Sequence, residues 1–126
     1  LDFSQHIAGD EDPSDGATLI TCPHPFGQWT VSEHGARAYR GLRTKRYTYV
    51  RDLQGPWLLY DNEKDPYQMR NLIDDEEVSD IREKLDQWLH QKLKETNDHF
   101  LSGSEYLSKW GYRVDETGTV PYTTEL

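Results

Sequence analysis

The amino-acid sequence predicts an α+β fold: a four-stranded antiparallel sheet packed against one long amphipathic helix, with an irregular C-terminal tail. Two observations predict it. Short runs of β-branched and aromatic residues, joined by tight turns, occupy positions 18–61. A single apolar stripe at helical spacing then occupies positions 78–93. Because a sheet must bury its apolar face, we expect the stripe to cover the sheet.

Four segments have the composition of strands. The first, 18–22, is short, β-branched and apolar, and a loop rich in proline follows it. Segments 36–44, 46–52 and 57–61 follow one another with short links. Along 36–44, successive residues fall alternately on the two faces of the expected strand. Links this short join antiparallel neighbours, so the last three segments predict a meander, and the first segment adds a fourth strand to the sheet.

The residues after Tyr60 predict a short helix at 65–71. Asp65 is suited to the N-cap and Pro66 to the first helical position. Gln68 stands where a capping box needs its amide, and Asn71 is expected to end the helix.

The longer helix is predicted by apolar residues that recur every three or four positions. Acidic residues at 74–77 are suited to the positive N-terminal end of the helix dipole, and Lys92 and Lys94 are suited to its negative C-terminal end. A helix of about 20 residues would be ~30 Å long. The stripe consists of Val78, Ile81, Leu85, Trp88, Leu89 and Leu93.

Composition divides the chain into three parts. Residues 1–16 are a polar, acidic lead-in that resembles a linker, and residues 17–97 form the α+β domain. Residues 98–126 hold aromatic and apolar residues at irregular spacing. We expect this last part to be a C-terminal extension, extended or a short helix, that packs on a neighbouring surface.

Size and charge limit the function. The 126 residues suit one domain with one modest core. The net charge of -9 argues against nucleic acid as the main partner. No apolar run approaches the ~20 residues that span a bilayer, and no signal peptide is visible. Because the chain begins at Leu1 rather than Met, we expect a mature product or an excised piece.

The basic residues are concentrated in one segment. Positions 37–51 contain six basic residues and no acidic residue. One interpretation is internal pairing with nearby carboxylates, such as those of the 61–65 turn. The other is a wall that faces an acidic or sulfated substrate through bidentate contacts. The six residues are Arg37, Arg40, Arg43, Lys45, Arg46 and Arg51.

Two motifs in the segment 39–72 resemble the C-terminal subdomain of the sulfatases, in the alkaline-phosphatase-like superfamily. The family pattern RxxRT-x-RYKY is matched by Arg40, Arg43, Thr44, Arg46, Tyr47 and Tyr49. The pattern LYDLxxDPxExxNL is matched by Leu59, Tyr60, Asp61, Asp65, Pro66, Asn71 and Leu72. The resemblance covers 36–73 well and the flanks loosely. It implies a secreted or periplasmic parent enzyme that hydrolyses sulfate esters with formylglycine and calcium, in a catalytic domain upstream of this chain.

The sequence predicts no catalytic or metal-binding residue within the chain itself. Formylglycine arises in the family from C/S-x-P-x-R, but Cys22 is followed directly by Pro23 and the arginine is missing. We therefore predict that Cys22 is a buried structural thiol. A nucleophile pair of Cys22 with His24 or His34 would lack a third, orienting residue. The alternating acids of the 61–65 turn are explained by capping and turn formation without a metal.

The loop 23–35 and the residues after it are the candidate contacts with substrate. By resemblance, loops of the C-terminal subdomain help to wall the substrate pocket of a sulfatase. Ordinary packing of an irregular loop is the alternative. The candidate residues are His24, Trp29, His34, Arg37 and Arg40.

The predicted function is that of a C-terminal sulfatase fragment, inactive alone, that supports the catalytic domain and walls the pocket. Its expected partners are that upstream domain, a sulfated substrate in the parent enzyme, and a second copy of the fragment through its exposed former interface. One alternative is the C-terminal part of a related phosphonate or phosphate monoesterase. Another is an independent module that binds anionic glycans through the basic segment.

Overall fold

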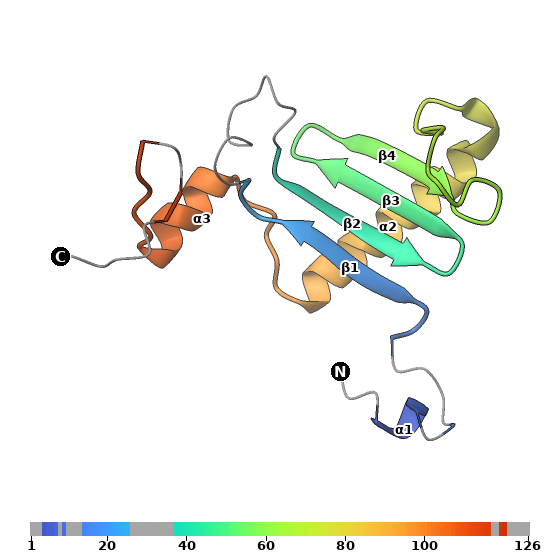
Figure 1. Cartoon of the computed structure of the whole chain (residues 1–126), viewed down its shortest axis with the longest axis horizontal. Coiled ribbons are helices and arrows are strands. Elements are labelled where there is room, and N and C mark those ends of the chain that lie inside the picture. Colours follow the sequence, from blue (N-terminus) through green and yellow to red (C-terminus); the bar gives the residue numbers. More distant parts are fainter. Residues whose placement is uncertain (1–3, 8, 10–13, 26–36, 117–118, 121–126) are drawn as a thin grey trace.

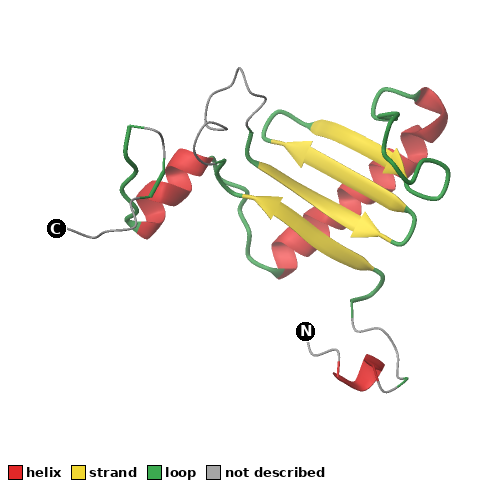
Figure 2. Cartoon of the chain, in the orientation of Figure 1, coloured by secondary structure: helices red, strands yellow, loops and turns green. Residues whose placement is uncertain are grey.

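The structure is a computed structural model that describes residues 4–7, 9, 14–25, 37–116 and 119–120. Four strands form one layer, and the helix α2 lies across one face of it (Figures 1 and 2). No helix among the described residues has the length and apolar character needed to cross a membrane. The elements are α1 (Ser4–Ile7), β1 (Ala17–Cys22), β2 (Tyr39–Thr44), β3 (Tyr47–Asp52), β4 (Pro56–Asp61), the 3-10 helix η3 (Glu76–Val78), α2 (Ser79–Glu95) and α3 (Gly103–Trp110).

The sheet has four antiparallel strands, as the sequence predicts, and their order is β1-β2-β3-β4. Its register places Leu19 opposite Leu42, Leu42 opposite Tyr49, and Tyr49 opposite Leu59. Directly opposed residues point to the same face of a sheet. These four side chains therefore form one apolar row that crosses all the strands, and three of them are fully buried.

Helix α2 covers this row, which confirms the predicted packing of the stripe on the sheet (Figure 1). Leu85, Leu89 and Leu93 are buried against the sheet. A polar contact adds to the apolar ones, because the Tyr49 hydroxyl donates to Asp86 Oδ1 at 2.5 Å. The margin of the core is formed by Val78, Ile81 and Trp88.

The predicted short helix at 65–71 is wrong, because this segment is an irregular turn. Gln68 has a φ of 54°, which interrupts a right-handed helix. Its side-chain amide donates instead to Thr48 Oγ1 at 3.0 Å and to Asn62 Oδ1 at 2.8 Å. Asp65 does bind backbone amides, including that of Arg70 at 2.8 Å, but without a helix to cap.

The C-terminal tail contains the short helix α3 (Gly103–Trp110), which is one of the two forms expected for it. Ser102 and Glu105 form a reciprocal capping box at its start. Gly111 ends it in the left-handed region with a φ of 70°. Local capping explains the helix, which the irregular spacing of the apolar residues does not reveal.

The fold predicts that Leu89 carries much of the packing energy between α2 and the sheet. Leu89→Ala should lower the free energy of unfolding by about 3 kcal/mol, because it leaves a cavity beneath a fully buried position. Urea unfolding followed by far-UV circular dichroism measures the change. Gln87→Ala is the matched control, because Gln87 is exposed on the same helix. Equal midpoints for the two variants would contradict the packing described here.

Candidate functional site

The predicted site residues that the structure describes lie at one end of the sheet. His24 follows β1, Arg37 precedes β2, and Arg40 lies within β2. The antiparallel pairing of Cys22 with Tyr39 brings these positions together from the two sides of the long connecting loop. Trp29 and His34 lie outside the described residues, so their predicted contacts stay predictions.

Arg40 is the most deeply buried charged residue of this end, with 1% of its surface exposed. Its Nε donates to Asp98 Oδ2 at 2.5 Å, and its Nη2 donates to Asp98 Oδ1 at 3.3 Å. Nη2 also donates to the Tyr106 hydroxyl at 3.1 Å. The rings of Phe100 and Tyr106 lie 4.8 and 5.6 Å from the guanidinium carbon. We call these four residues the Arg40 cluster.

The cluster is held by charge as well as by geometry. Burial alone would raise the pKa of the Asp98 carboxyl, but hydrogen bonds from Arg40, Tyr106 and the Phe100 amide outweigh it and lower the pKa to about 2. Burial and the hydrogen bond to Asp98 raise the pKa of the Tyr106 phenol. Asp98 therefore stays ionised and Tyr106 stays protonated at neutral pH, which is the state that the hydrogen bonds require.

Arg37 is more accessible than Arg40, with 42% of its side chain exposed. Its Nη1 donates to Asp52 Oδ2 at 2.8 Å, and its guanidinium lies over the Trp57 ring at 4.4 Å. Asp52 also accepts backbone hydrogen bonds from the β3–β4 turn through Oδ1. Arg37 is thus fixed to the sheet while part of its cationic surface faces outward.

His24 packs against the start of α3. A side chain added at Gly103 would overlap the His24 ring, which would have to shift to admit it. The imidazole therefore serves at least as a spacer between the end of β1 and α3. Its predicted contact with a substrate stays a prediction.

The remaining arginines of the basic segment have partners within the protein. Arg46 Nη2 bonds Asp61 Oδ2 at 2.8 Å, and Arg51 Nη1 bonds Asp86 Oδ1 at 2.8 Å. The hydrogen bond from Arg46 lowers the pKa of Asp61. Arg43 donates to neutral oxygens of the sheet and of the adjoining turn. Internal pairing with carboxylates, the first of the two interpretations of this segment, is therefore confirmed for four arginines and not for Arg43. The four are Arg37, Arg40, Arg46 and Arg51.

Cys22 is half-buried rather than fully buried. Burial raises the pKa of its thiol, although the charge of Arg40 and the backbone amide of His24 act in the opposite direction. A thiol with a raised pKa is mostly protonated at neutral pH and is a weak nucleophile. Within the described part of the chain, no three His, Cys, Asp or Glu side chains are arranged to hold a metal ion.

The sequence did not reveal the partners of Arg40. Asp98 lies 58 positions from Arg40, and Tyr106 lies 66 positions away. No periodic pattern links such distant residues. The only local signal nearby is the Ser102–Glu105 capping pattern, which places Tyr106 on a helix but does not name the surface that it meets.

The Arg40 cluster predicts a large effect of removing the Asp98 charge. Asp98→Asn should lower the free energy of unfolding by about 3 kcal/mol at pH 7, because it leaves the Arg40 guanidinium buried without a counter-ion. The folded pKa of about 2 lies below the ordinary value of 3.8. The stabilisation is therefore complete above pH 3.8 and is lost as the pH falls towards 2. Urea unfolding at pH 7, 4 and ~2.5 should show the difference between wild type and variant shrinking.

Asp75→Asn provides the matched control for this charge. Asp75 pairs with Arg70 at the surface, where 76% of the arginine side chain is exposed. A surface pair of this kind contributes at most about 1 kcal/mol. If Asp98→Asn cost no more than Asp75→Asn, the Arg40 cluster would not be the anchor described here.

Comparisons with known proteins agree with the resemblance in the sequence. The ulvan-active sulfatase of Formosa agariphila is 36% identical over 111 residues, which are 88% of this chain and 21% of that protein. A proposed sulfatase, yidJ from Bacteroides fragilis, has a crystal structure that matches with a TM-score of 0.59 and 25% identity. That match covers 79% of this chain and 20% of the other. The chain thus spans about a fifth of the length of each relative.

The family model described as N-sulphoglucosamine sulphohydrolase, C-terminal, matches residues 26–96. This range includes β2, β3, β4 and α2, and therefore most of the sheet and the helix that covers it. The chain belongs to the N-sulphoglucosamine sulphohydrolase C-terminal family.

Proposed function

We propose that this chain forms the C-terminal domain of a sulfatase that hydrolyses sulfate esters of sugars. The observation that carries the proposal is the family match over residues 26–96. This range includes both sulfatase-like motifs, one in the basic segment and the other at the end of β4 and the turn after it. The names of the two relatives support the same class. The family description names a sulfated amino sugar, and the Formosa relative is named for activity on ulvan, so a sulfated glycan is the proposed substrate class.

The reaction itself is assigned to another part of the longer protein. The sulfatase resemblance implies formylglycine and calcium, and the described residues of this chain do not fit either. Cys22 stands in the wrong motif, and Asp61 is already held by Arg46. Asp65 accepts the backbone amide of Arg70. The catalytic steps are therefore proposed to take place in the upstream part of the longer protein.

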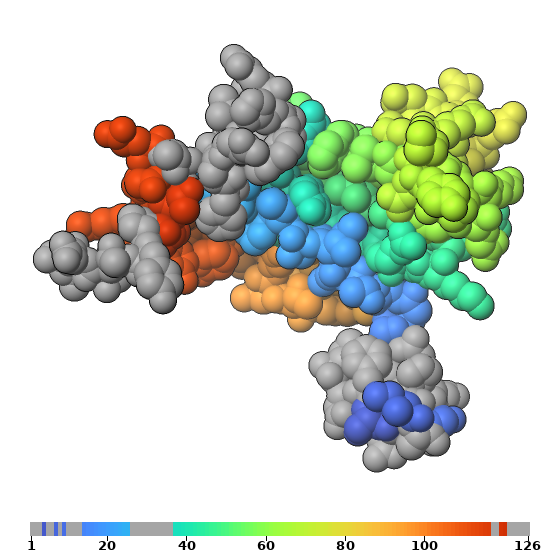
Figure 3. All heavy atoms as spheres, in the orientation of Figure 1, coloured from blue at the N-terminus to red at the C-terminus, as the bar shows by residue number. Residues whose placement is uncertain are grey.

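One proposed role is mechanical support of the catalytic part. Tyr67 and Met69 are 85% and 84% exposed on the turn after β4, although both side chains are large and apolar. Gln68 lies between them and points inward to Thr48 and Asn62. The turn thus presents two apolar side chains from an anchored backbone, and in Figure 3 it projects from one end of the molecule. Exposed apolar groups on an ordered turn are suited to docking.

The other proposed role is to wall one side of the substrate pocket. Arg37 is the described candidate with an accessible guanidinium, and its contacts with Asp52 and Trp57 hold it in place. A preorganised cation of this kind binds a sulfate oxygen without first ordering a flexible side chain. Arg40 would act by fixing the end of β2 rather than by touching the substrate, because it is buried.

The pocket-wall role predicts a binding defect when Arg37 is removed. In the longer protein that contains this chain, Arg37→Ala should raise KM for a sulfated oligosaccharide about tenfold and change kcat much less, as expected for loss of a ground-state contact. Release of sulfate followed by ion chromatography measures both constants. The matching phosphate ester, assayed in parallel, separates a sulfatase from a phosphate monoesterase.

Asp52→Asn is the control for this experiment. It removes the same ion pair but keeps Arg37 and the Oδ1 acceptor for the β3–β4 turn. If Asp52→Asn raised KM as much as Arg37→Ala, the effect would come from the ion pair and not from a contact with substrate. Unchanged constants for Arg37→Ala across several sulfated substrates would remove the pocket-wall role.

A further inference from the structure

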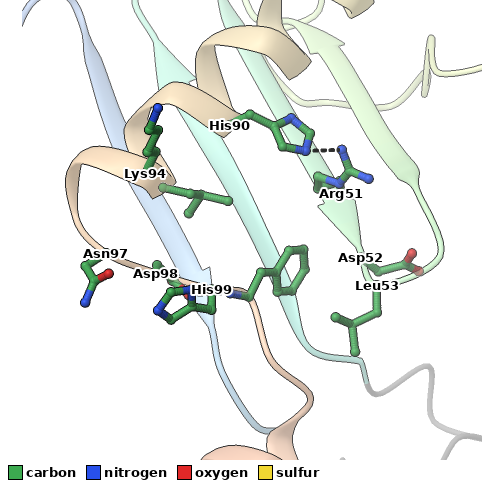
Figure 4. Close-up of a pocket in the computed structure, with 10 residues that line it drawn as sticks. Arg51, Asp52, Leu53, His90, Lys94, Asn97, Asp98 and His99 are labelled. Carbon is green, nitrogen blue, oxygen red and sulfur yellow. Dashed lines mark hydrogen bonds between the residues drawn. The ribbon is translucent and has the colours of Figure 1, made fainter.

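A hollow of about 440 Å³ lies where the last turn of α2 meets the end of β3. Figure 4 shows its two sides, with Arg51 from β3 and Leu53 from the turn after it on one side, and His90 and Lys94 from the helix on the other. The segment after α2 closes the hollow and contributes His99. None of the proposed functions above uses this hollow.

The C-terminal cap of α2 fixes the geometry of the hollow. The Asp98 amide donates to the Leu93 carbonyl at 2.8 Å, and the Asn97 amide donates to the Lys94 carbonyl at 3.2 Å. With Asn97 at a φ of 54°, these bonds form a Schellman motif that reverses the chain. The reversal carries Phe100 back to the Arg40 cluster. The segment that lines the hollow after α2 is therefore held by backbone hydrogen bonds to the last turn of α2 and by the contact of Phe100 with Arg40.

The carboxylates of the hollow are neutralised by arginines behind them. Asp52 is paired with Arg37 at 2.8 Å, and Asp98 is paired with Arg40 at 2.5 Å. Both acids are thus committed to internal partners and offer little repulsion to an anion. The acidic character of the whole chain, with a net charge of -9, is not repeated at this place.

Three side chains of the hollow have unused hydrogen-bonding groups. Lys94, Asn97 and His99 are exposed, and within the described part of the chain their side chains form no hydrogen bond or ion pair. They present an ammonium group, an amide and an imidazole. An ammonium group can only donate, and the amide and the imidazole can donate as well.

His90 is oriented by two bonds. Its Nδ1 lies 2.8 Å from the Asp86 carbonyl oxygen, which can only accept, so Nδ1 carries the proton. Its Nε2 therefore accepts from Arg51 Nη1 at 3.1 Å, the contact drawn as a dashed line in Figure 4. Arg51 is also held by Asp86 at 2.8 Å. These contacts hold His90 and Arg51 in place, whereas the side chains of Lys94, Asn97 and His99 have no such partner among the described residues.

We propose that the hollow binds an acidic sugar unit, bearing a sulfate ester or a carboxylate, of the glycan substrate. The anionic group would accept a charge-assisted hydrogen bond from Lys94. The apolar groups of Leu53, Leu93 and Phe100, which also line the hollow, suit the C–H face of a sugar ring. Elsewhere the net negative charge of the chain disfavours a polyanion, which makes this local set of donors selective.

The inference rests on the proposed function and extends it. Asp52 lines the hollow and also holds Arg37 of the proposed pocket wall. One ion pair therefore separates the two places. A glycan whose sulfated unit lies at the wall would place a neighbouring acidic unit at the hollow.

Calorimetric titration of the 126-residue chain with a chondroitin 4-sulfate tetrasaccharide tests the proposal, because this probe has both sulfate esters and carboxylates. Lys94→Gln should weaken binding about tenfold, the loss expected for one charge-assisted contact. Lys84→Gln is the matched control, since Lys84 is exposed on the same helix and outside the hollow. It changes the net charge equally and should leave binding within about twofold of wild type. Equal melting temperatures of both variants exclude misfolding.

Two further probes identify the recognised group. The desulfated tetrasaccharide keeps its carboxylates, so retained binding assigns a carboxylate and lost binding assigns a sulfate, and either result supports the hollow. Cellotetraose carries no charge and should not bind. Equal binding of cellotetraose, equal affinity of Lys94→Gln and wild type, or absence of binding to every charged probe would overturn the inference. Sulfate release by the longer protein is a separate readout, so the proposed function stands or falls independently.

Discussion

The ion pair between Arg40 and Asp98 is the interaction on which the functional end of this protein depends. It joins strand β2 to the segment after α2, across 58 positions of sequence. A guanidinium that is 1% exposed must have a counter-ion and a full set of acceptors, because an unpaired charge is very costly to bury. Asp98, Tyr106 and the Tyr39 carbonyl meet that demand. Arg40 in the sheet therefore fixes the position of Asp98, and the position of Asp98 fixes the path of the residues before and after it.

Several features of this end of the molecule follow from that one position. The Schellman turn before Asp98 ends α2, and Phe100 after it lies against the same guanidinium. Tyr106 brings α3 to the sheet, where His24 fits against Gly103. The charge distribution follows as well. The arginines of the basic segment are held by internal partners, whereas Lys94, outside that segment, has none among the described residues. Counting charges along the sequence locates the basic segment, whereas only the pairing in three dimensions shows which cations have no internal partner.

The sheet and α2 could be predicted because their signals are local. The row from Leu19 to Leu59 follows from alternation and short links, and the stripe on α2 follows from helical spacing. The turn after β4 could not, because the Gln68 amide has partners on β3 and at Asn62 that override its capping preference. The positions of His24, Arg37 and Arg40 at one end of the sheet follow from antiparallel pairing. Their partners, and the free donors Asn97 and His99, depend on contacts that no local pattern encodes.

The framework residues and the contact residues of this end are separate sets, and this separation has a physical origin. Arg40 is buried, and its hydrogen bonds to Asp98 and Tyr106 occupy the groups that a ligand would need. Lys94 and Asn97 contribute little to stability because they are exposed, and their donors remain free for a ligand. The backbone of Asn97 nevertheless belongs to the cap that Asp98 completes. Side chains that contact a glycan can therefore change while the backbone that positions them stays anchored by the ion pair of Asp98 with Arg40.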